Sequence, residues 1–328
     1  MNFRVEGTCG DARAGVMETA HGPVRTPVFM PVGTQGAVKA ITPRDLGDMG
    51  VEIILGNTYH LYLRPGTEII SAAGGLQRFS GWKKPILTDS GGFQVYSLAK
   101  LRKVDDDGVT FQSHLDGSSH RFTPESVVST QRLIGSDIMM VLDECPPFPC
   151  DERYAAESNR RTLEWAARCQ TAARTGEALY GYEQAVFGIA QGSTYPGIRE
   201  RSISTLVELG FDGYAIGGLA VGEPAGVMYE IIEVCVRQIP RGSPRYLMGV
   251  GTPANLLEAV ERGVDMFDCV LPTRNGRNAM AFTRHGSLTI TNARHANEFT
   301  QLDESCGCYA CGNFTRAYLR HLFMVKEV

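Results

Sequence analysis

The sequence predicts an α/β protein built as a (β/α)8 TIM barrel, and two observations carry that prediction. Eight short apolar runs recur along the 328 residues, each followed by turn residues and then by a helical stretch. Glycine is abundant, with 37 residues, which suits the tight strand-to-helix turns that this fold repeats. An open, doubly wound sheet is the alternative, because it also alternates strands with helices.

The expected strands are short and rich in aliphatic residues, as buried parallel strands are. They cover residues 28–32, 51–55, 85–88, 137–142, 185–190, 213–216, 245–248 and 264–267. Helices are expected over residues 42–49, 124–134, 152–175, 197–209, 225–238 and 253–262. Thr42 before Pro43 and Thr123 before Pro124 are typical of helix starts.

Smaller elements are expected around the barrel. Residues 111–122 alternate in polarity and turn at Asp116-Gly117, which predicts a hairpin inserted after the third strand. Residues 281–290 favour a second small β unit, and residues 314–326 a helix. We therefore expect a barrel with an N-terminal β extension over residues 1–283 and a partial zinc-binding subdomain over 284–328.

The net charge is −4, so no global basic signal indicates nucleic acid. Residues 271–328 alone carry +3, however, and the rest −7, so a local basic end could meet phosphates. The start of the chain is polar, and no apolar run is long enough for a membrane span. We expect a cytoplasmic protein with no membrane partner.

The residues after the expected strands are unusually polar or glycine-rich. Because a barrel enzyme carries its chemistry at the carboxyl ends of its strands, seven such turns in succession predict a functional mouth. The turns begin at Gly56-Asn57, Asp89-Ser90, Asp143-Glu144, Gln191-Gly192, Gly217-Gly218, Gly249-Val250 and Asp268.

Three carboxylates, Asp89, Asp143 and Asp268, would face one pocket. Like charges in one pocket shift pKa values apart and allow separate acid, base and nucleophile roles. Two carboxylates beside an acetal carbon are the equipment for glycosyl transfer. Glycine turns let a flat ligand reach backbone N–H groups, and Gln191 beside Asp143 suits a heterocycle with both N–H donors and a carbonyl.

Eight long segments resemble the tRNA-guanine transglycosylases of the bacterial type, in the same order along the chain. They are ILTDSGGFQVYSL, HLDGSSHRFTPE, MMVLDECPPFP, FGIAQGS, AIGGLAVGE, YLMGVGTP, GVDMFDCVLPTRNGRNAMAFT and CGCYACGNFTRAYLRHLF. The resemblance implies a pentosyltransferase that exchanges guanine at the tRNA wobble position for a deazaguanine base, as a step of queuosine biosynthesis.

The resemblance also implies a role for each matching residue. Asp268 would be the nucleophile that forms a covalent glycosyl-enzyme, and Asp89 the general acid/base. The base would lie among Ser90, Gly91, Gly92, Phe93, Asp143, Gln191, Gly217, Gly218, Leu219 and Met248. The tRNA would contact two segments, Gly249, Val250, Gly251, Thr252, Pro253, Ala254 and Asn255, and Thr273, Arg274, Asn275, Gly276 and Arg277.

Two positions bear on the choice of base. Val221 and Cys145 stand where related eukaryotic enzymes carry smaller residues that admit queuine, so the resemblance implies the smaller 7-aminomethyl-7-deazaguanine. Glu223 would help to receive the cationic aminomethyl group through the backbone of Leu219-Ala220. Plain packing is the alternative for Val221.

Cys306, Cys308 and Cys311 form a Cys-x-Cys-x-x-Cys pattern that predicts a structural Zn²⁺ site, with reduced cysteines as the alternative. The resemblance places the fourth ligand, a histidine, beyond Val328, so the chain resembles a shortened family member. His321 matches a family histidine that is not the ligand. The resemblance also implies a homodimer.

Two other classes of function stay open from the residues. A non-catalytic tRNA-binding subunit of the same family would be expected to lack the nucleophile, yet Asp268 is present. A glycoside hydrolase using Asp89 and Asp143 would leave Arg274, Arg277 and the cysteines without a purpose.

Overall fold

The computed structural model describes residues 1–97 and 102–327. They form two compact units, Met1–Val250 with Ala254–Cys269, and Gly251–Pro253 with Val270–Val328. The expected division after Thr283 stays a prediction. Each unit is described by itself.

The first unit is a closed barrel of eight parallel strands, as predicted. In order around the barrel they are β4 (Val28–Pro31), β5 (Ile54–Gly56), β6 (Ile86–Thr88), β10 (Ile138–Met140), β11 (Ala185–Ala190), β12 (Gly213–Ile216), β13 (Arg245–Leu247) and β14 (Met266–Cys269). β14 pairs with β4, and a parallel bridge between Val32 and Leu55 joins β4 to β5. The sequential strand order and this closure exclude the open sheet.

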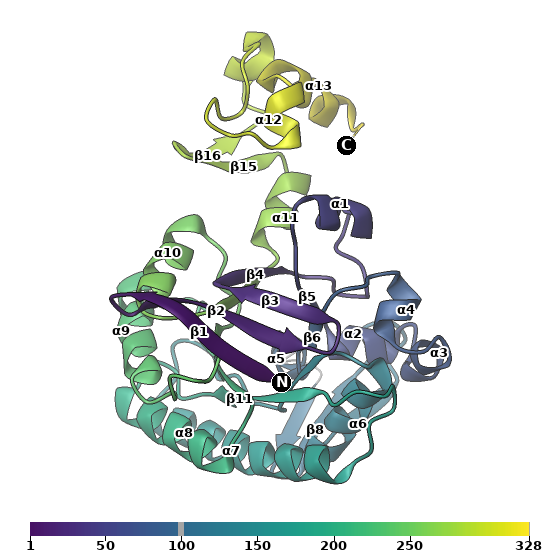
Figure 1. The fold of residues 1–328 in the computed structure, drawn as a ribbon, viewed down its shortest axis with the longest axis vertical. Helices are drawn as coiled ribbons and strands as arrows, with labels where there is room; N and C mark the ends of the chain where they lie inside the picture. The colour runs from purple at the N-terminus through teal and green to yellow at the C-terminus, as the bar shows by residue number, and fades with distance from the viewer. Residues whose placement is uncertain (98–101, 328) are drawn as a thin grey trace. The chain divides into compact units, whose positions relative to one another are not determined.

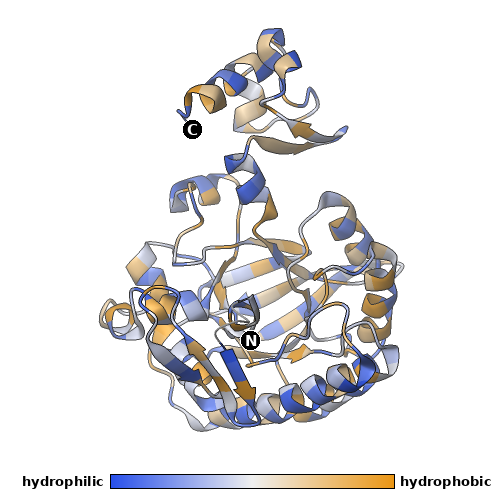
Figure 2. Cartoon of the chain, turned by 180° about the vertical axis from the view of Figure 1, so that it is seen from behind, coloured by the Kyte–Doolittle hydropathy of each residue, from blue (hydrophilic) through white to orange (hydrophobic). Residues whose placement is uncertain are grey.

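Helices surround the barrel (Figure 1). The longer ones are α6 (Pro124–Ile134), α7 (Glu152–Thr175), α8 (Pro196–Leu209), α9 (Ala225–Val236) and α10 (Pro253–Glu261). Both expected caps are confirmed, since Thr42 and Thr123 each form a reciprocal capping box at α1 (Pro43–Asp48) and α6. Hydrophobic and hydrophilic residues alternate along these helices (Figure 2), which matches one face packed on the strands and one in water.

Short helices after the second and third barrel strands were not expected. They are α2 (Thr58–Leu63), α3 (Thr67–Ala72), α4 (Leu76–Ser80) and α5 (Gly92–Ser97). With five or six residues each, they are too short to show a helical repeat of apolar residues in the sequence.

Two small antiparallel sheets accompany the barrel. β1 (Asn2–Cys9), β2 (Ala12–Thr19) and β3 (Gly22–Thr26) form the N-terminal β extension. The expected hairpin is confirmed as β8 (Gly108–Gln112) and β9 (Ser119–Phe122), with β7 (Arg102–Asp105) as an additional strand.

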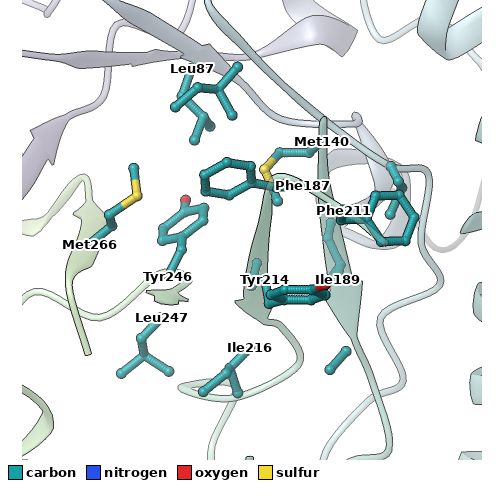
Figure 3. Close-up of a cluster of buried hydrophobic side chains, with 14 of the residues drawn as sticks. Leu87, Met140, Phe187, Ile189, Phe211, Tyr214, Ile216, Tyr246, Leu247 and Met266 are labelled. Carbon is teal, nitrogen blue, oxygen red and sulfur yellow. The ribbon is translucent and has the colours of Figure 1, made fainter. Parts of the chain in front are cut away.

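The core of the barrel fixes the strands that carry the site. Tyr246 of β13 and Met266 of β14 point into a cluster with Leu87 and Phe187 (Figure 3). At the opposite end of these strands, Arg13 of β2 donates to Asp265 in a buried ion pair, and Asp265 also accepts the backbone N–H of Arg245 at 2.7 Å. Because both partners are buried and further hydrogen-bonded, this pair fixes the register of β13 and β14.

The second unit has its own small core. Its elements are α11 (Leu271–Arg277), β15 (Met280–Thr283), β16 (Gly286–Thr289), a 3₁₀ turn η2 (Ala293–Asn297), α12 (Tyr309–Asn313) and α13 (Arg316–Val325). Ala279, Leu288, Ile290, Leu302 and Cys311 pack together in this core. The expected β unit and C-terminal helix are confirmed.

Candidate active site

The predicted site residues of the first unit lie where barrel strands end. Asp89 follows β6, Asp143 follows β10, Gln191 follows β11, and Gly217-Gly218 follow β12. Asp268 lies within β14 itself, one residue from its end. Since all eight strands are parallel, these groups share the carboxyl end of the barrel.

Asp268 is held by two donors on the same oxygen. The Tyr246 hydroxyl donates to Oδ1 at 2.6 Å, and the backbone N–H of Gly249 donates to Oδ1 at 2.8 Å. Burial raises the pKa of Asp268, and these two hydrogen bonds oppose that rise because they favour the charged form. The geometry holds one carboxylate oxygen firmly and orients the other.

Asp89 accepts several hydrogen bonds although it is almost fully buried. Asn57 Nδ2 donates to Oδ2, and the backbone N–H groups of Thr58 and Gly91 donate to Oδ1 at 2.9 and 3.2 Å. Burial nevertheless dominates and raises the pKa of Asp89 to about 6. This pKa lies close to physiological pH, which suits a group that gives and takes a proton.

The raised pKa of Asp89 predicts a pH-dependent stability difference. Between about pH 4 and pH 6 the folded state binds more protons at Asp89 than the unfolded state, so the free energy of unfolding falls as pH rises through that window. Between these limits the free energy of unfolding of the wild type should fall by about 2 to 3 kcal/mol relative to that of Asp89→Asn. Urea unfolding of both proteins across this range measures the difference; a difference that stays constant or grows with pH would refute the expectation.

Asp143 joins the ends of three strands. Ser90 Oγ donates to Asp143 Oδ1 at 3.0 Å, and Gln191 Nε2 donates to Asp143 Oδ2 at 2.7 Å. Asp143 is buried, and burial raises its pKa. The buried Gln191 Oε1 has no hydrogen-bond partner among the described residues. An acceptor-only carboxylate beside an unsatisfied amide oxygen fits a ligand that presents N–H donors.

Glycines permit this close packing. A Cβ on Gly92 would overlap Asp143 Oδ1, and a Cβ on Gly218 would overlap Gln191 Oε1. At Gly217 a Cβ would lie 2.7 Å from Ile189 Cγ2 and 2.8 Å from Gln191 Nε2. Gly218 also has a φ of +64°, which residues with a Cβ rarely adopt. Larger residues at these positions would displace the polar groups.

The remaining predicted pocket residues differ in exposure. Leu219 is buried, Met248 is half-buried, and Phe93 in α5 is 52% exposed. Glu223 Oε2 accepts the backbone N–H of Val221 at 3.1 Å, and Glu223 Oε1 accepts that of Ala220. Glu223 thus fixes the loop after β12.

Three side chains that hold parts of the predicted site were not predicted from the sequence. Tyr246 holds Asp268, Asn57 holds Asp89, and Arg199 of α8 donates to backbone oxygens near Gly218. Asn57 was noted only as part of a polar turn, and Tyr246 lies inside an apolar run that predicts core. Burial raises the pKa of Tyr246, and the charges of Asp268 and Asp89 raise it further.

The two segments expected to contact tRNA are divided between the units. Gly249, Val250, Ala254 and Asn255 belong to the first unit, and Val250 is 1% exposed, so its side chain is part of the core. Gly251, Thr252 and Pro253 belong to the second unit, as do Thr273, Arg274, Asn275, Gly276 and Arg277. Asn275-Gly276 lies within the helix α11, with Asn275 buried and both arginines exposed.

Cys306, Cys308 and Cys311 lie together in the second unit. Their sulfur atoms are within 4.8 Å of one another, and the structure pairs none of the three in a disulfide. Three soft thiolates at this spacing fit a Zn²⁺ ion. Within residues 1–97 and 102–327, no histidine or carboxylate joins this group, and His321 lies outside it.

If the three cysteines hold a zinc ion, the protein has a measurable metal content. The purified protein should hold about one zinc ion per chain, and Cys308→Ser should hold far less, because structural zinc depends on each thiolate ligand. Atomic absorption after dialysis measures the content. Cys9→Ser is the matched control, since Cys9 is exposed and lies outside the group. Equal zinc content in wild type and Cys308→Ser would contradict the assignment.

The fold and site define a class of protein, a (β/α)8-barrel enzyme with several carboxylates at the carboxyl ends of its strands. Carboxylates in such an arrangement can catalyse glycosyl transfer. Residues 8–328 match the model of the family described as queuine tRNA-ribosyltransferase. The chain belongs to the queuine tRNA-ribosyltransferase family.

Relatives with the same description cover almost the whole chain. A queuine tRNA-ribosyltransferase of Caldanaerobacter subterraneus subsp. tengcongensis is 56% identical over 317 residues, 97% of this chain and 83% of that protein. Another, of Pelotomaculum thermopropionicum, is 56% identical over 317 residues and 84% of its length. A third, of Lawsonia intracellularis, is 55% identical over 326 residues, 99% of this chain and 87% of that protein.

Across the described ranges 1–97 and 102–327, no helix combines the length and apolar character needed to cross a bilayer.

Proposed function

We propose that this protein exchanges guanine at the wobble position of tRNA for a 7-substituted 7-deazaguanine, through a covalent glycosyl-enzyme. Membership in the queuine tRNA-ribosyltransferase family supports base exchange on tRNA. The observation that carries the mechanism is Asp268, whose Oδ1 accepts both the Tyr246 hydroxyl and the Gly249 N–H. We also propose a cytoplasmic location, which family membership and tRNA as a substrate support.

Asp268 is the nucleophile in this proposal. With Oδ1 held by two donors, Oδ2 attacks the anomeric carbon of the ribose. A carbon–oxygen bond forms, the carbon–nitrogen glycosidic bond breaks, and its electron pair goes onto the departing guanine. In the second half of the reaction a ring nitrogen of the incoming base attacks the same carbon and expels the carboxylate.

Asp89 is the general acid/base. It supplies a proton to the departing guanine and accepts one from the incoming base, so the two halves balance. Its pKa of about 6 allows both protonation states near neutral pH. The donors from Asn57, Thr58 and Gly91 keep its carboxyl group in one orientation during both steps.

The base is read by groups of opposite polarity. The Asp143 carboxylate accepts from the N–H edge of a guanine-type ring. Gln191 and the backbone at Gly218 meet its carbonyl oxygen, with the ring held against Phe93 and Met248. Ser90 Oγ and Gln191 Nε2 already fix Asp143, so this acceptor is in place before the base enters.

Base choice follows from the loop after β12 and from Cys145. Val221 and the buried Cys145 limit the space for a substituent, which favours the small 7-aminomethyl group over queuine's ring. The loop that Glu223 fixes presents backbone oxygens to the cationic aminomethyl group.

The second unit supplies tRNA contacts in this proposal. The exposed Arg274 and Arg277 meet phosphates and base edges, and zinc on the three cysteines stabilises the unit. A homodimer is part of the same proposal. The two rival functions have less support: Asp268 is present and fully hydrogen-bonded on Oδ1, which disfavours a non-catalytic subunit, and family membership disfavours a glycoside hydrolase.

Incorporation of labelled guanine into tRNA tests the proposed function. The wild type should incorporate the label, and unlabelled 7-aminomethyl-7-deazaguanine should compete with it more strongly than queuine does. Absence of incorporation into intact tRNA would refute base exchange. Release of free sugar from glycans, without any response to tRNA, would favour the hydrolase instead.

A further inference from the structure

Arg199 is a buried cation that the proposed mechanism leaves without a role. It lies in the first turn of α8, its side chain is 0% exposed, and all its hydrogen bonds go to backbone oxygens. Nε donates to Ser193 O at 2.8 Å, Nη1 to Ala190 O at 2.8 Å, and Nη2 to Gly218 O at 3.4 Å. The guanidinium therefore joins the turns that follow β11 and β12.

Its charge is not neutralised by an ion pair. Among the described residues no carboxylate lies within ion-pair distance of Arg199, and the same holds for the buried Arg245, whereas the buried Arg13 pairs with Asp265. Removing an unpaired cation from water is costly, and burial lowers the pKa of Arg199 for that reason. Arg245 shows that a buried arginine can join backbone segments far from the candidate site, so the case for a functional charge rests on where Arg199 lies.

The charge lies directly behind the part of the pocket that receives the carbonyl of the base. A Cβ built on Gly218 would overlap Gln191 Oε1 and would lie 3.6 Å from Arg199 Nη2. The Gly218 carbonyl points toward Arg199, and in a trans peptide the following N–H, of Leu219, points the opposite way. Arg199 thus sets the orientation of the backbone that meets the base.

We propose that Arg199 is a positioning residue that orients the Gly218 peptide and whose positive charge stabilises the departing guanine as an anion. This rests on the proposed function. When the glycosidic bond breaks, its electron pair enters the guanine ring and part of the charge develops on the ring carbonyl oxygen. A cation fixed behind Gly218 and Gln191 lowers the energy of that charge until Asp89 delivers the proton.

Arg199→Gln and Arg199→Lys distinguish the effect of the positive charge from that of the hydrogen bonds that join the two turns. Arg199→Gln should lower kcat for guanine exchange by about a hundredfold, with KM for tRNA within about twofold, because the lost stabilisation belongs to the transition state. Arg199→Lys keeps the charge and should retain at least about a tenth of wild-type kcat. Arg201→Gln, an exposed position on the same helix, is the matched control and should behave as wild type.

A binding measurement tests the effect of the Arg199 charge independently of catalysis. At mildly alkaline pH, 8-azaguanine, whose ring N–H is more acidic than that of guanine, is largely anionic. Wild type should prefer 8-azaguanine over guanine by calorimetry, and Arg199→Gln should lose that preference while Arg199→Lys keeps it.

The outcomes remain distinguishable from failure of the proposed function. If the wild type exchanges no guanine, the proposed function is refuted. The ratio of the affinities for 8-azaguanine and guanine then tests the role of Arg199 by itself. Equal kcat losses in Arg199→Lys and Arg199→Gln, with an unchanged ratio, would overturn the proposal in favour of a structural tie. If thermal unfolding shows that Arg199→Gln does not fold, the test uses Arg199→Lys instead. A folded Arg199→Lys that no longer prefers 8-azaguanine over guanine would overturn the proposal.

Discussion

Asp268→Asn should abolish guanine exchange, with a loss of about a thousandfold or more in kcat, because the amide cannot form the covalent bond to the ribose. The change is nearly isosteric. The amide oxygen can still accept the Tyr246 hydroxyl and the Gly249 N–H that Oδ1 accepts in the wild type, so the pocket should keep its shape. Incorporation of labelled guanine into tRNA measures the loss.

Two controls make the Asp268→Asn result specific. Asp107→Asn removes an exposed carboxylate from the turn between β7 and β8 and should leave exchange unchanged. Binding of guanine to Asp268→Asn, by calorimetry, should remain within about tenfold of wild type, because base recognition belongs to Asp143 and Gln191. Substantial exchange by folded Asp268→Asn would mean that another group is the nucleophile.

Gly218→Ala should lower kcat/KM by about a hundredfold or more, since small displacements in a catalytic site are costly. The new methyl group would overlap Gln191 Oε1, and Gln191 cannot move freely because Nε2 donates to Asp143. The φ of +64° at Gly218 adds backbone strain. Steady-state kinetics with tRNA and guanine measure the effect.

Gly226→Ala is the matched control for Gly218→Ala. Gly226 lies at the start of α9, where a new Cβ meets nothing within 4 Å and the backbone is helical. Alanine there should leave kinetics unchanged and raise stability by up to about 1 kcal/mol. Equal kinetics in wild type and Gly218→Ala would show that the Gln191–Gly218 contact does not shape the base pocket.

The barrel was predictable because its strands are buried on both sides. Each gives a short apolar run that ends in a polar or glycine turn, as at 185–190, which the structure confirms without a shift as β11. Asp89, Asp143, Gln191 and Gly218 follow such runs directly, so their common location at the mouth follows from parallel strands alone. The spacing of Cys306, Cys308 and Cys311 likewise indicated that their sulfur atoms lie close together.

The supporting residues were not predictable for a physical reason. Tyr246 lies within an apolar strand, and only the tertiary fold brings its hydroxyl to Asp268. Arg199 resembles the surface arginines of an amphipathic helix, and its burial depends on how α8 packs. Asn275-Gly276 favours a turn locally, yet Leu271–Arg277 is helical, which shows context overriding local preference.

The central claim, covalent attachment of tRNA to Asp268, is tested most directly by trapping the intermediate. Wild type mixed with tRNA and quenched in denaturant should show a protein–RNA adduct, and nuclease and protease digestion followed by mass spectrometry should place a ribose-linked mass on the peptide containing Asp268. Added free guanine should discharge the adduct, and Asp268→Asn should form none. An adduct on another residue, or efficient exchange with no adduct at any quench time, would contradict the account.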